Sequence, residues 1–386
     1  MSAAVDIVTF GCRLNLVDSE RLLREARAGA KGERVVVNTC AVTAEATRQA
    51  RQTIRRIRRE RPAAEIVVAG CAARIDPQSF SGMDGVARVL VEPGEPRAES
   101  ASEGQTRAFL AVQNGCDHRC TFCVIPFGRG PSRSTAPADV LAEARRLVES
   151  GKREIVLTGV DLTSYAAEGV SLGGLLRALL RELPQLERLR LSSIDCIEAD
   201  AELLDCMSAE PRVMPHLHLS LQSGDDLMLK RMKRRHARGD AIRFCADLRA
   251  ARPDIVFGAD FIVGFPTETQ EMFSRTLDLV EECGLTHLHV FPFSARPGTP
   301  AALMPQVNGA LVKERAARLR EAGEAALVRH LDAQIGKTLR VLTEKGGMAR
   351  AEDFTPLRTP GAEAGVMFDV RVTGHDGKAL SGAPAA

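Results

Sequence analysis

The sequence of 386 residues lacks tryptophan and has one tyrosine, Tyr165, so phenylalanine and histidine are the side chains left for stacking on a base. It also lacks an apolar run of about 18 residues, which a membrane-spanning helix needs, and an N-terminal secretory signal. An excess of one charge is absent too, because 52 basic and 50 acidic residues leave a net charge of +2. We therefore expect a soluble, cytoplasmic protein with no membrane partner, which would contact nucleic acid only through local patches.

The length predicts two or three domains, and the 45% of apolar residues is ample for their cores. Ten cysteines in such a chain indicate metal or redox chemistry rather than a disulfide framework.

Short β-branched runs at 5–10, 34–37 and 65–69 alternate with helical stretches at 18–29 and 44–61. This alternation predicts an N-terminal domain built on a parallel sheet. The segment 92–107 is polar and rich in proline, glycine and serine, and it is the best candidate for a linker.

A second, longer alternation follows the predicted linker. The predicted strands are 108–113, 154–158, 187–192, 216–221, 255–263 and 286–293. The predicted helices are 137–150, 173–183, 199–208, 239–250, 268–283 and 310–333. Six strand–helix units favour a partial (β/α)6 barrel, which places its chemistry on loops at the carboxyl ends of the strands.

The pattern changes again from about residue 336. Predicted strands at 338–345, 353–358 and 365–372, with turns at 346–347 and 376–377, indicate a small β-barrel. The fold class is therefore α/β, and the expected domains are 1–98, 99–333 and 334–386.

Cys116, Cys120 and Cys123, called the barrel triplet below, have the spacing C-x3-C-x2-C directly after the first predicted barrel strand. Three thiolates on one loop can bind three irons of a [4Fe–4S] cluster and leave the fourth open to a small chelating ligand. A zinc site or a set of structural cysteines is the alternative, but structural zinc usually takes four protein ligands.

Cys12, Cys40 and Cys71, called the N-terminal triplet below, each follow the end of an N-terminal strand. Carboxyl ends of neighbouring parallel strands lie together, so these thiols can converge on a second cluster. They can equally be three buried cysteines, because free cysteine is among the most buried residue types.

Segment 114–130, which contains the barrel triplet and continues Val-Ile-Pro-Phe-Gly-Arg-Gly, resembles the radical S-adenosylmethionine enzymes, and more narrowly their methylthiotransferase branch. Asn-Thr-Cys-Ala-Val-Thr at 38–43, followed by a basic helix, is similar to the MtaB group of that branch. The C-terminal module resembles a TRAM domain, a small β-barrel associated with RNA binding. Other matching segments, which extend the resemblance over essentially the whole chain, are 10–20, 36–43, 67–74, 120–134, 157–165, 221–226, 260–269 and 291–301.

The resemblance implies two [4Fe–4S] clusters and S-adenosylmethionine as cofactors. The barrel triplet would be catalytic, because its cluster binds S-adenosylmethionine and cleaves it to a 5′-deoxyadenosyl radical. The N-terminal triplet would bind the second cluster, which handles sulfur. Polar residues at strand ends that we expect to contact S-adenosylmethionine are Asp161, Ser193, Gln222, Asp260 and Arg296.

The resemblance further implies insertion of a methylthio group at C2 of N6-threonylcarbamoyladenosine at tRNA position 37, with an electron donor such as flavodoxin or ferredoxin. The same chemistry on isopentenyladenosine in tRNA, or on an aspartate of a ribosomal protein, is the close alternative. An iron–sulfur electron-transfer protein that binds RNA without modifying it is the alternative from another class, and the open-iron spacing and the barrel disfavour it.

Two basic runs, 48–61 and 230–238, are the candidate contacts with tRNA phosphates. A solvated charged face is the ordinary explanation for such a run. The C-terminal module is nearly balanced in charge, so its expected contact with tRNA follows from the resemblance. His216, His218, His287 and His289 alternate on predicted strands, and we favour packing over catalysis for them.

Overall fold

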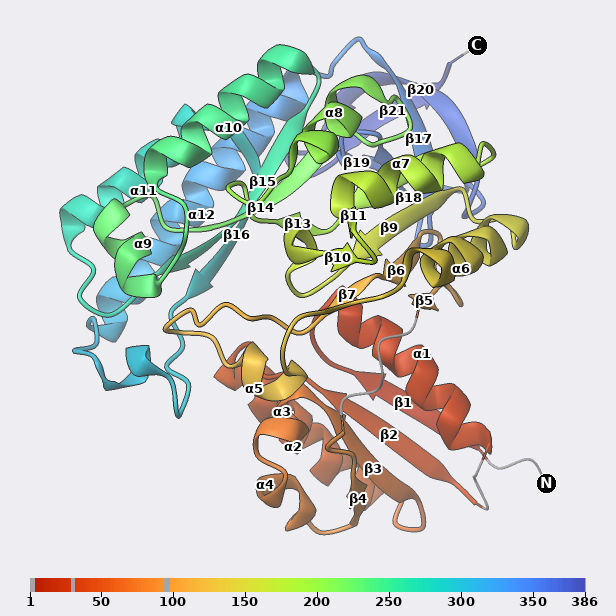
Figure 1. Ribbon diagram of the computed structural model, residues 1–386, viewed down its shortest axis with the longest axis vertical. Helices are drawn as coiled ribbons and strands as arrows, with labels where there is room; N and C mark the ends of the chain where they lie inside the picture. Colours follow the sequence, from red (N-terminus) through yellow and green to blue (C-terminus); the bar gives the residue numbers. More distant parts are fainter. Residues whose placement is uncertain (1–3, 29–31, 93–97, 386) are drawn as a thin grey trace.

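The computed structural model describes residues 4–28, 32–92 and 98–385, and Figure 1 shows their arrangement. The N-terminal part is a four-stranded parallel sheet in the order β1 (Val5–Thr9), β2 (Arg34–Thr39), β3 (Glu65–Gly70), β4 (Val86–Val89). The predicted parallel sheet is confirmed, and β4 is an edge strand that the sequence pattern did not reveal.

Alternating side chains of this sheet enter two separate cores, as the period of a strand requires. Val36 and Val67 pack with Leu22 of α1 (Arg13–Ala28), whereas Val35 and Val37 pack on the opposite face. That second face is covered by α2 (Ala44–Glu60), α3 (Cys71–Ile75) and α4 (Gln78–Ser81).

Helix α2 begins where the Thr43 side chain accepts a hydrogen bond from the Ala46 amide, a standard N-cap. It buries Ala50, Ile54 and Ile57 and leaves most of its arginines outside. The predicted linker 92–107 differs in part, because β5 (Glu99–Ala101) forms within it and pairs with β6 (Ala108–Ala111). Residues 93–97 lie outside the described part of the chain.

Six parallel barrel strands follow in sequence order, and the fourth to sixth form one sheet. They are β6 (Ala108–Ala111), β9 (Glu154–Thr158), β12 (Arg188–Leu191) continued by β13 (Ser193–Ile194), β14 (His216–Gln222), β15 (Val256–Val263) and β16 (Leu285–Pro292). The sheets are β12-β9-β6-β5 and β13-β14-β15-β16, and the interrupted strand at Ser192 joins them. The wall is therefore an open (β/α)6 barrel, as the sequence predicted.

The barrel helices match the six predicted ones closely, and one short helix at 226–232 is added to them. They are α6 (Pro137–Glu149), α7 (Leu172–Glu182), α8 (Ala201–Ala209), α9 (Asp226–Met232), α10 (Arg238–Ala251), α11 (Gln270–Glu282) and α12 (Gly309–Asp332). Short additional elements are β7 (Gln113–Asn114), α5 (Ile125–Arg129), β8 (Arg133–Ser134), η1 (Leu162–Ser164), β10 (Ala166–Ala167), β11 (Val170–Ser171) and η2 (Pro300–Leu303). Across the described ranges, no helix is long and apolar enough to cross a membrane.

The C-terminal module is a closed barrel in the order β17-β18-β19-β21-β20. Its strands are β17 (Thr338–Glu344), β18 (Met348–Ala351), β19 (Pro356–Arg358), β20 (Met367–His375) and β21 (Leu380–Pro384). The predicted small β-barrel is confirmed, with β18 and β21 added. Val341, Leu357 and Val370 are among the residues of its core.

This module closes the end of the large barrel where the strands begin (Figure 1). The Arg188 guanidinium, at the first residue of β12, donates to the carbonyls of Arg350 (3.2 Å) and Arg340 (2.8 Å). Glu154, at the first residue of β9, is fully buried and accepts from Arg190 at 2.9 Å. Buried charges at this junction must be paired, which fixes how the two barrels meet.

We expect the ionised carboxylate of Glu154 to stabilise the folded protein, because it is paired with buried arginines. Burial raises the pKa of this carboxyl, but Arg190, Arg107 and Arg188 outweigh it, so the net shift is downward from the ordinary 4.5. Glu154→Gln should lower the free energy of unfolding by about 3–5 kcal/mol at neutral pH, because it leaves buried arginines unpaired. Chemical denaturation measures this loss.

The difference between wild type and Glu154→Gln should shrink as the pH falls through the lowered folded pKa, where the carboxylate is protonated. The control is Asp205→Asn, because the Arg177–Asp205 pair at 3.1 Å is 51% and 72% exposed and should contribute less than about 1 kcal/mol. Equal effects of the two changes would contradict the assigned role of Glu154.

Candidate functional site

The N-terminal triplet converges at the carboxyl end of the first sheet. Cys12 lies in the turn after β1, Cys40 follows β2, and Cys71 opens α3 directly after β3. Gly11 permits the approach: its φ is +101°, and a Cβ there would lie 2.8 Å from the sulfur of Cys40. Burial, with smaller contributions from Cys12 and Cys71, raises the pKa of the Cys40 thiol to about 11.

A buried arginine connects this triplet to the barrel. Arg129 of α5 donates to Asn15 Oδ1 at 2.5 Å and to Asp18 at 2.9 Å, and both acceptors belong to α1. Burial alone lowers the pKa of the Arg129 guanidinium, but the charges of Cys71, Asp18 and Cys12 outweigh it and the net shift is upward. Asn15 also donates to the Thr39 carbonyl at 3.0 Å, so one network holds α1, β2 and α5.

The barrel triplet lies on the loop between β7 and α5. Gly115 begins this loop with a φ of +76°, and a Cβ there would meet the Pro131 carbonyl oxygen at 1.9 Å. Burial and, to a smaller extent, the nearby Asp161 carboxylate raise the pKa of the Cys116 thiol to about 12. Arg234 donates to the Cys120 sulfur at 3.8 Å.

Asp161 and His118 lie beside Cys116, and Glu198 contacts that histidine. His118 Nε2 lies 3.0 Å from Asp161 and 3.2 Å from Glu198, and these hydrogen bonds raise the His118 pKa to about 10. The Asp161 carboxylate also lies 3.7 Å from the Cys116 sulfur. Asp161 is thus beside the barrel triplet, whereas no sequence pattern indicated His118 or Glu198.

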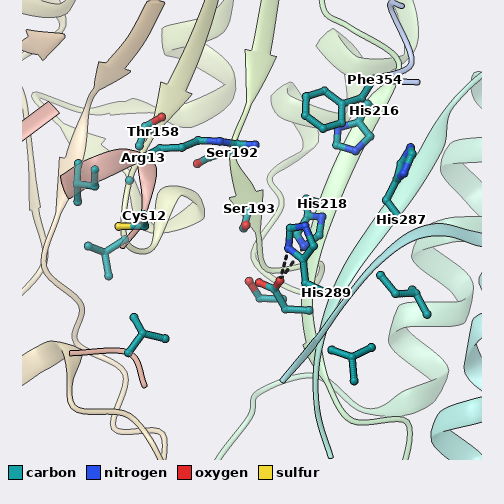
Figure 2. A pocket seen from close by; sticks show the side chains of 18 of the residues that line it. Cys12, Arg13, Thr158, Ser192, Ser193, His216, His218, His287, His289 and Phe354 are labelled. Atoms are coloured by element: carbon teal, nitrogen blue, oxygen red, sulfur yellow. Dashed lines mark hydrogen bonds and ion pairs between the residues drawn. The ribbon is translucent and has the colours of Figure 1, made fainter. Parts of the chain in front are cut away.

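A cavity of about 880 Å³ extends from the N-terminal triplet into the barrel. All three cysteines of that triplet line it, as do Ile125 and Arg129 from the helix after the barrel triplet. Its far end reaches His216 and Phe354, a residue of the C-terminal module, as Figure 2 shows. Parts of the chain that are distant in sequence therefore share one chamber.

Asp260 lies at the centre of a hydrogen-bonded group in this cavity. Its Oδ1 is 2.9 Å from His218 Nε2 and 3.0 Å from His289 Nδ1. Burial raises the pKa of the Asp260 carboxyl, but the two imidazoles outweigh it and the net shift is strongly downward. The four histidines predicted to serve packing all line the cavity, so they are available to a ligand.

The other predicted contacts with S-adenosylmethionine lie in different places. Ser193 lines the cavity, and Gln222 ends β14 with a φ of +68°. Arg296 lies on the side of the N-terminal triplet, where it donates a hydrogen bond to Thr47 Oγ1 at 3.4 Å. Burial lowers the pKa of its guanidinium, and the nearby Cys40 partly opposes this shift.

The first basic run, on α2, divides into paired and free arginines. Arg48, Arg51, Arg58 and Arg61 form ion pairs with Glu45, Asp76, Asp84 and Asp6, respectively. Arg55, Arg56 and Arg59 instead line a surface pocket of about 570 Å³, and in the described ranges no carboxylate pairs with them. The free cations therefore gather on one stretch of α2.

Most arginines of the second basic run form ion pairs with carboxylates of the protein itself. Arg234 pairs with Asp195 at 2.7 Å, Arg235 with Glu198, and Arg238 with Glu282 at 2.6 Å. Lys230 and Lys233 are exposed and have no ion-pair partner among the described residues. This run offers fewer free charges than its sequence suggests.

Comparison with known proteins agrees with this geometry. The radical SAM superfamily model matches residues 110–280, and the model described as uncharacterized protein family UPF0004 matches residues 4–92. The radical S-adenosylmethionine methyltransferase TsrM from Kitasatospora setae is similar in fold, with a TM-score of 0.58, 17% identity and coverage of 78% of this chain and 77% of that one. Fold and cysteine spacing together define a radical S-adenosylmethionine enzyme.

Curated relatives narrow this class. Threonylcarbamoyladenosine tRNA methylthiotransferase MtaB of Rickettsia prowazekii is 42% identical over 92% of this chain and 90% of that one. A tRNA-2-methylthio-N(6)-dimethylallyladenosine synthase of Cereibacter sphaeroides is 37% identical over 97% of each chain. The chain belongs to the tRNA methylthiotransferase family of radical S-adenosylmethionine enzymes, which use two [4Fe–4S] clusters and S-adenosylmethionine.

Both triplets offer donor sets that fit such clusters. Each consists of thiols alone, and thiolate is the usual ligand of cluster iron. Amides of Val42 and Ile125 point at the sulfurs of Cys40 and Cys123, each at 3.5 Å, which is the outer hydrogen bonding that tunes a bound cluster. The remaining four cysteines are buried apart from both triplets, at Cys196, Cys206, Cys245 and Cys283.

Proposed function

We propose that this enzyme inserts a methylthio group at C2 of N6-threonylcarbamoyladenosine at position 37 of tRNA. One observation supports this most directly: a single cavity is lined by the N-terminal triplet and by the segment that follows the barrel triplet. The relative from Rickettsia prowazekii, which is named for this substrate, supports the choice of nucleoside. We also infer a cytoplasmic location, which a tRNA substrate supports.

We assign one [4Fe–4S] cluster to the barrel triplet and another to the N-terminal triplet, and the domains to 1–98, 99–333 and 334–386. When bound, the clusters and S-adenosylmethionine supply the radical, the methyl group and the sulfur. Asp161, Ser193, Gln222 and Asp260 are our candidates for holding S-adenosylmethionine. Arg296 was predicted to do so as well, and its position beside Cys40 favours a role at the sulfur-handling side.

The protein's own groups position the reactants. Arg129, Asn15 and Asp18 hold the N-terminal triplet over the cavity, and Arg234 donates to Cys120. The electron enters from a donor such as flavodoxin or ferredoxin.

The main alternative is the same reaction on isopentenyladenosine, because the 37%-identical relative is named for dimethylallyladenosine. A ribosomal-protein aspartate as acceptor is a further alternative. Free cations on α2 favour a nucleic acid over a protein side chain, since phosphate contacts supply much of the affinity for RNA.

Nucleoside analysis decides between these substrates. Deleting the gene should abolish 2-methylthio-N6-threonylcarbamoyladenosine in tRNA and leave its unmethylthiolated precursor, as measured by mass spectrometry. Complementation with wild type should restore the product, whereas the Cys116→Ala variant should not. Loss of methylthiolated isopentenyladenosine instead would establish the alternative.

Iron content tests the two-cluster assignment. Anaerobic reconstitution should give about eight irons per chain if each triplet binds a [4Fe–4S] cluster, and alanine at all three barrel cysteines should leave about half. Colorimetric iron analysis measures both values. A wild-type content near four irons would contradict the N-terminal site.

The triplets should also fail in different ways. Cys12→Ala or Cys71→Ala should stop methylthio transfer but still form 5′-deoxyadenosine, because the barrel triplet is intact. Alanine at Cys120 should stop both. Chromatography of the small-molecule products separates the two outcomes, and methylthiolation by Cys12→Ala would refute the sulfur-handling role.

The free arginines of α2 should contribute to binding of tRNA phosphates. Replacing Arg55, Arg56 and Arg59 with Gln should make the log–log salt dependence of tRNA affinity shallower by roughly two to three units, because three contacts no longer release counterions. Fluorescence titration over a range of salt measures the slope.

The matched control replaces Arg48, Arg58 and Arg61 of the same basic run, which are already paired with the carboxylates of Glu45, Asp84 and Asp6. It should change the slope by less than one unit. Equal changes of the salt slope in both triple variants would show that the helix acts through its overall charge. They would contradict a specific role of Arg55, Arg56 and Arg59 in binding phosphates.

A further inference from the structure

Arg13 is a cation without a partner in the wall of the cavity. It is the first residue of α1 and directly follows Cys12 of the N-terminal triplet. Figure 2 shows its side chain extending from the N-terminal domain across the cavity toward Ser192. In the described part of the chain it has no ion pair or hydrogen bond, and its guanidinium lies 5.8 Å from the centre of the Phe109 ring.

The charges around Arg13 do not neutralise it. They are Arg107, Arg190, Glu154 and Arg350, so three of the four are cations. Glu154 is already within ion-pair distance of three other arginines, with Arg190 closest at 2.9 Å. Glu344, the carboxylate of the neighbouring module, is taken by Arg107 at 2.8 Å and Arg350 at 3.4 Å. This end of the cavity carries an excess of positive charge that a bound anion would offset.

Unused polar atoms lie at the same end. Ser192 and His216 are only 6% and 5% exposed and both line the cavity. The Ser192 hydroxyl and both ring nitrogens of His216 have no hydrogen-bond partner among the described residues. Buried polar groups are usually satisfied, so these atoms indicate a ligand with polar groups of its own.

We propose that Arg13 binds the carboxylate of the threonylcarbamoyl group. Ser192 and His216 form hydrogen bonds with the polar atoms beside that carboxylate. This inference rests on the proposed function. C2 and N6 lie on the same edge of adenine, so a C2 held near the N-terminal triplet directs the N6 substituent toward the residue that follows Cys12.

This contact makes Arg13 a specificity-determining residue. An isopentenyl group has no charge and no hydrogen-bonding atom, so it would leave the guanidinium, Ser192 and His216 desolvated and unpaired. A site built for polar partners rejects an analogue that lacks them more strongly than an apolar pocket rejects a larger group. The same cavity then distinguishes the two modified adenosines for which relatives of this chain are named.

Two other anions have to be considered, the methionyl carboxylate of S-adenosylmethionine and an RNA phosphate. The first belongs at the open iron of the barrel triplet, where Arg234 is the nearby cation. The second stays outside the chamber, because the phosphates follow the backbone while the modified base enters. Position next to Cys12 therefore favours the substrate carboxylate.

The test compares two anticodon stem–loops that carry N6-threonylcarbamoyladenosine either as the free acid or as its methyl ester, which keeps the shape and removes the charge. The fully reconstituted wild-type enzyme should methylthiolate the acid with kcat/KM roughly ten- to a hundredfold above the ester, and should bind it more tightly. Arg13→Gln should lose most of this preference by slowing the acid, while its rate on the ester changes little. Arg13→Lys should retain part of the preference.

Arg24→Gln, an exposed arginine on the same helix, is the matched control and should keep the wild-type preference. Equal wild-type rates on acid and ester, or equal slowing of both by Arg13→Gln at normal iron content, would overturn the inference and leave the proposed function standing. A lower affinity of Arg13→Gln for S-adenosylmethionine would identify the cofactor carboxylate as the anion and would also overturn it. If wild type methylthiolates neither stem–loop, the proposed function fails and this inference fails with it.

Discussion

The buried guanidinium of Arg129 is the interaction on which the arrangement of the two cysteine triplets depends. It comes from the helix that follows the barrel triplet, and its acceptors, Asn15 and Asp18, lie on the helix that begins beside Cys12. An unpaired arginine at this depth would be strongly destabilising, so the two domains must meet at this point. As a result the N-terminal triplet opens into the barrel, where the helix that follows the barrel triplet lines the same cavity.

The elements and the cysteines were predictable because they rest on local patterns. Strand and helix periods gave the parallel sheet, the open barrel and the small closed barrel, and cysteines at strand ends gave both triplets. Arg129, His118 and Phe354 were not predictable, because their roles depend on which segments meet in space. Sequence spacing also could not place Arg296, whose strand-end position fits either side of the cavity but whose neighbours are Thr47 and Cys40.

Charge runs illustrate the same limit. The two basic runs have similar composition. In α2, Arg55, Arg56 and Arg59 have no carboxylate partner among the described residues. In the second run, Arg234 and Arg238 form ion pairs with carboxylates of the protein. Counting arginines predicts a positive surface only when their carboxylate partners are known, and those partners come from other elements. The free stretch of α2 is therefore the stronger candidate for contact with RNA.

The C-terminal module also takes part in forming the cavity. Its Phe354 has a φ of +72°, a strained conformation for a bulky residue, and it stacks on His216 at 4.8 Å between ring centres. The same ring lies within 5.2 Å of the guanidinium carbons of Arg107, Arg190 and Arg350. The ring thus lies against three cations without neutralising them, so this end of the chamber keeps its positive charge. A module that resembles an RNA-binding domain therefore also shapes the environment in which the modified base would be recognised.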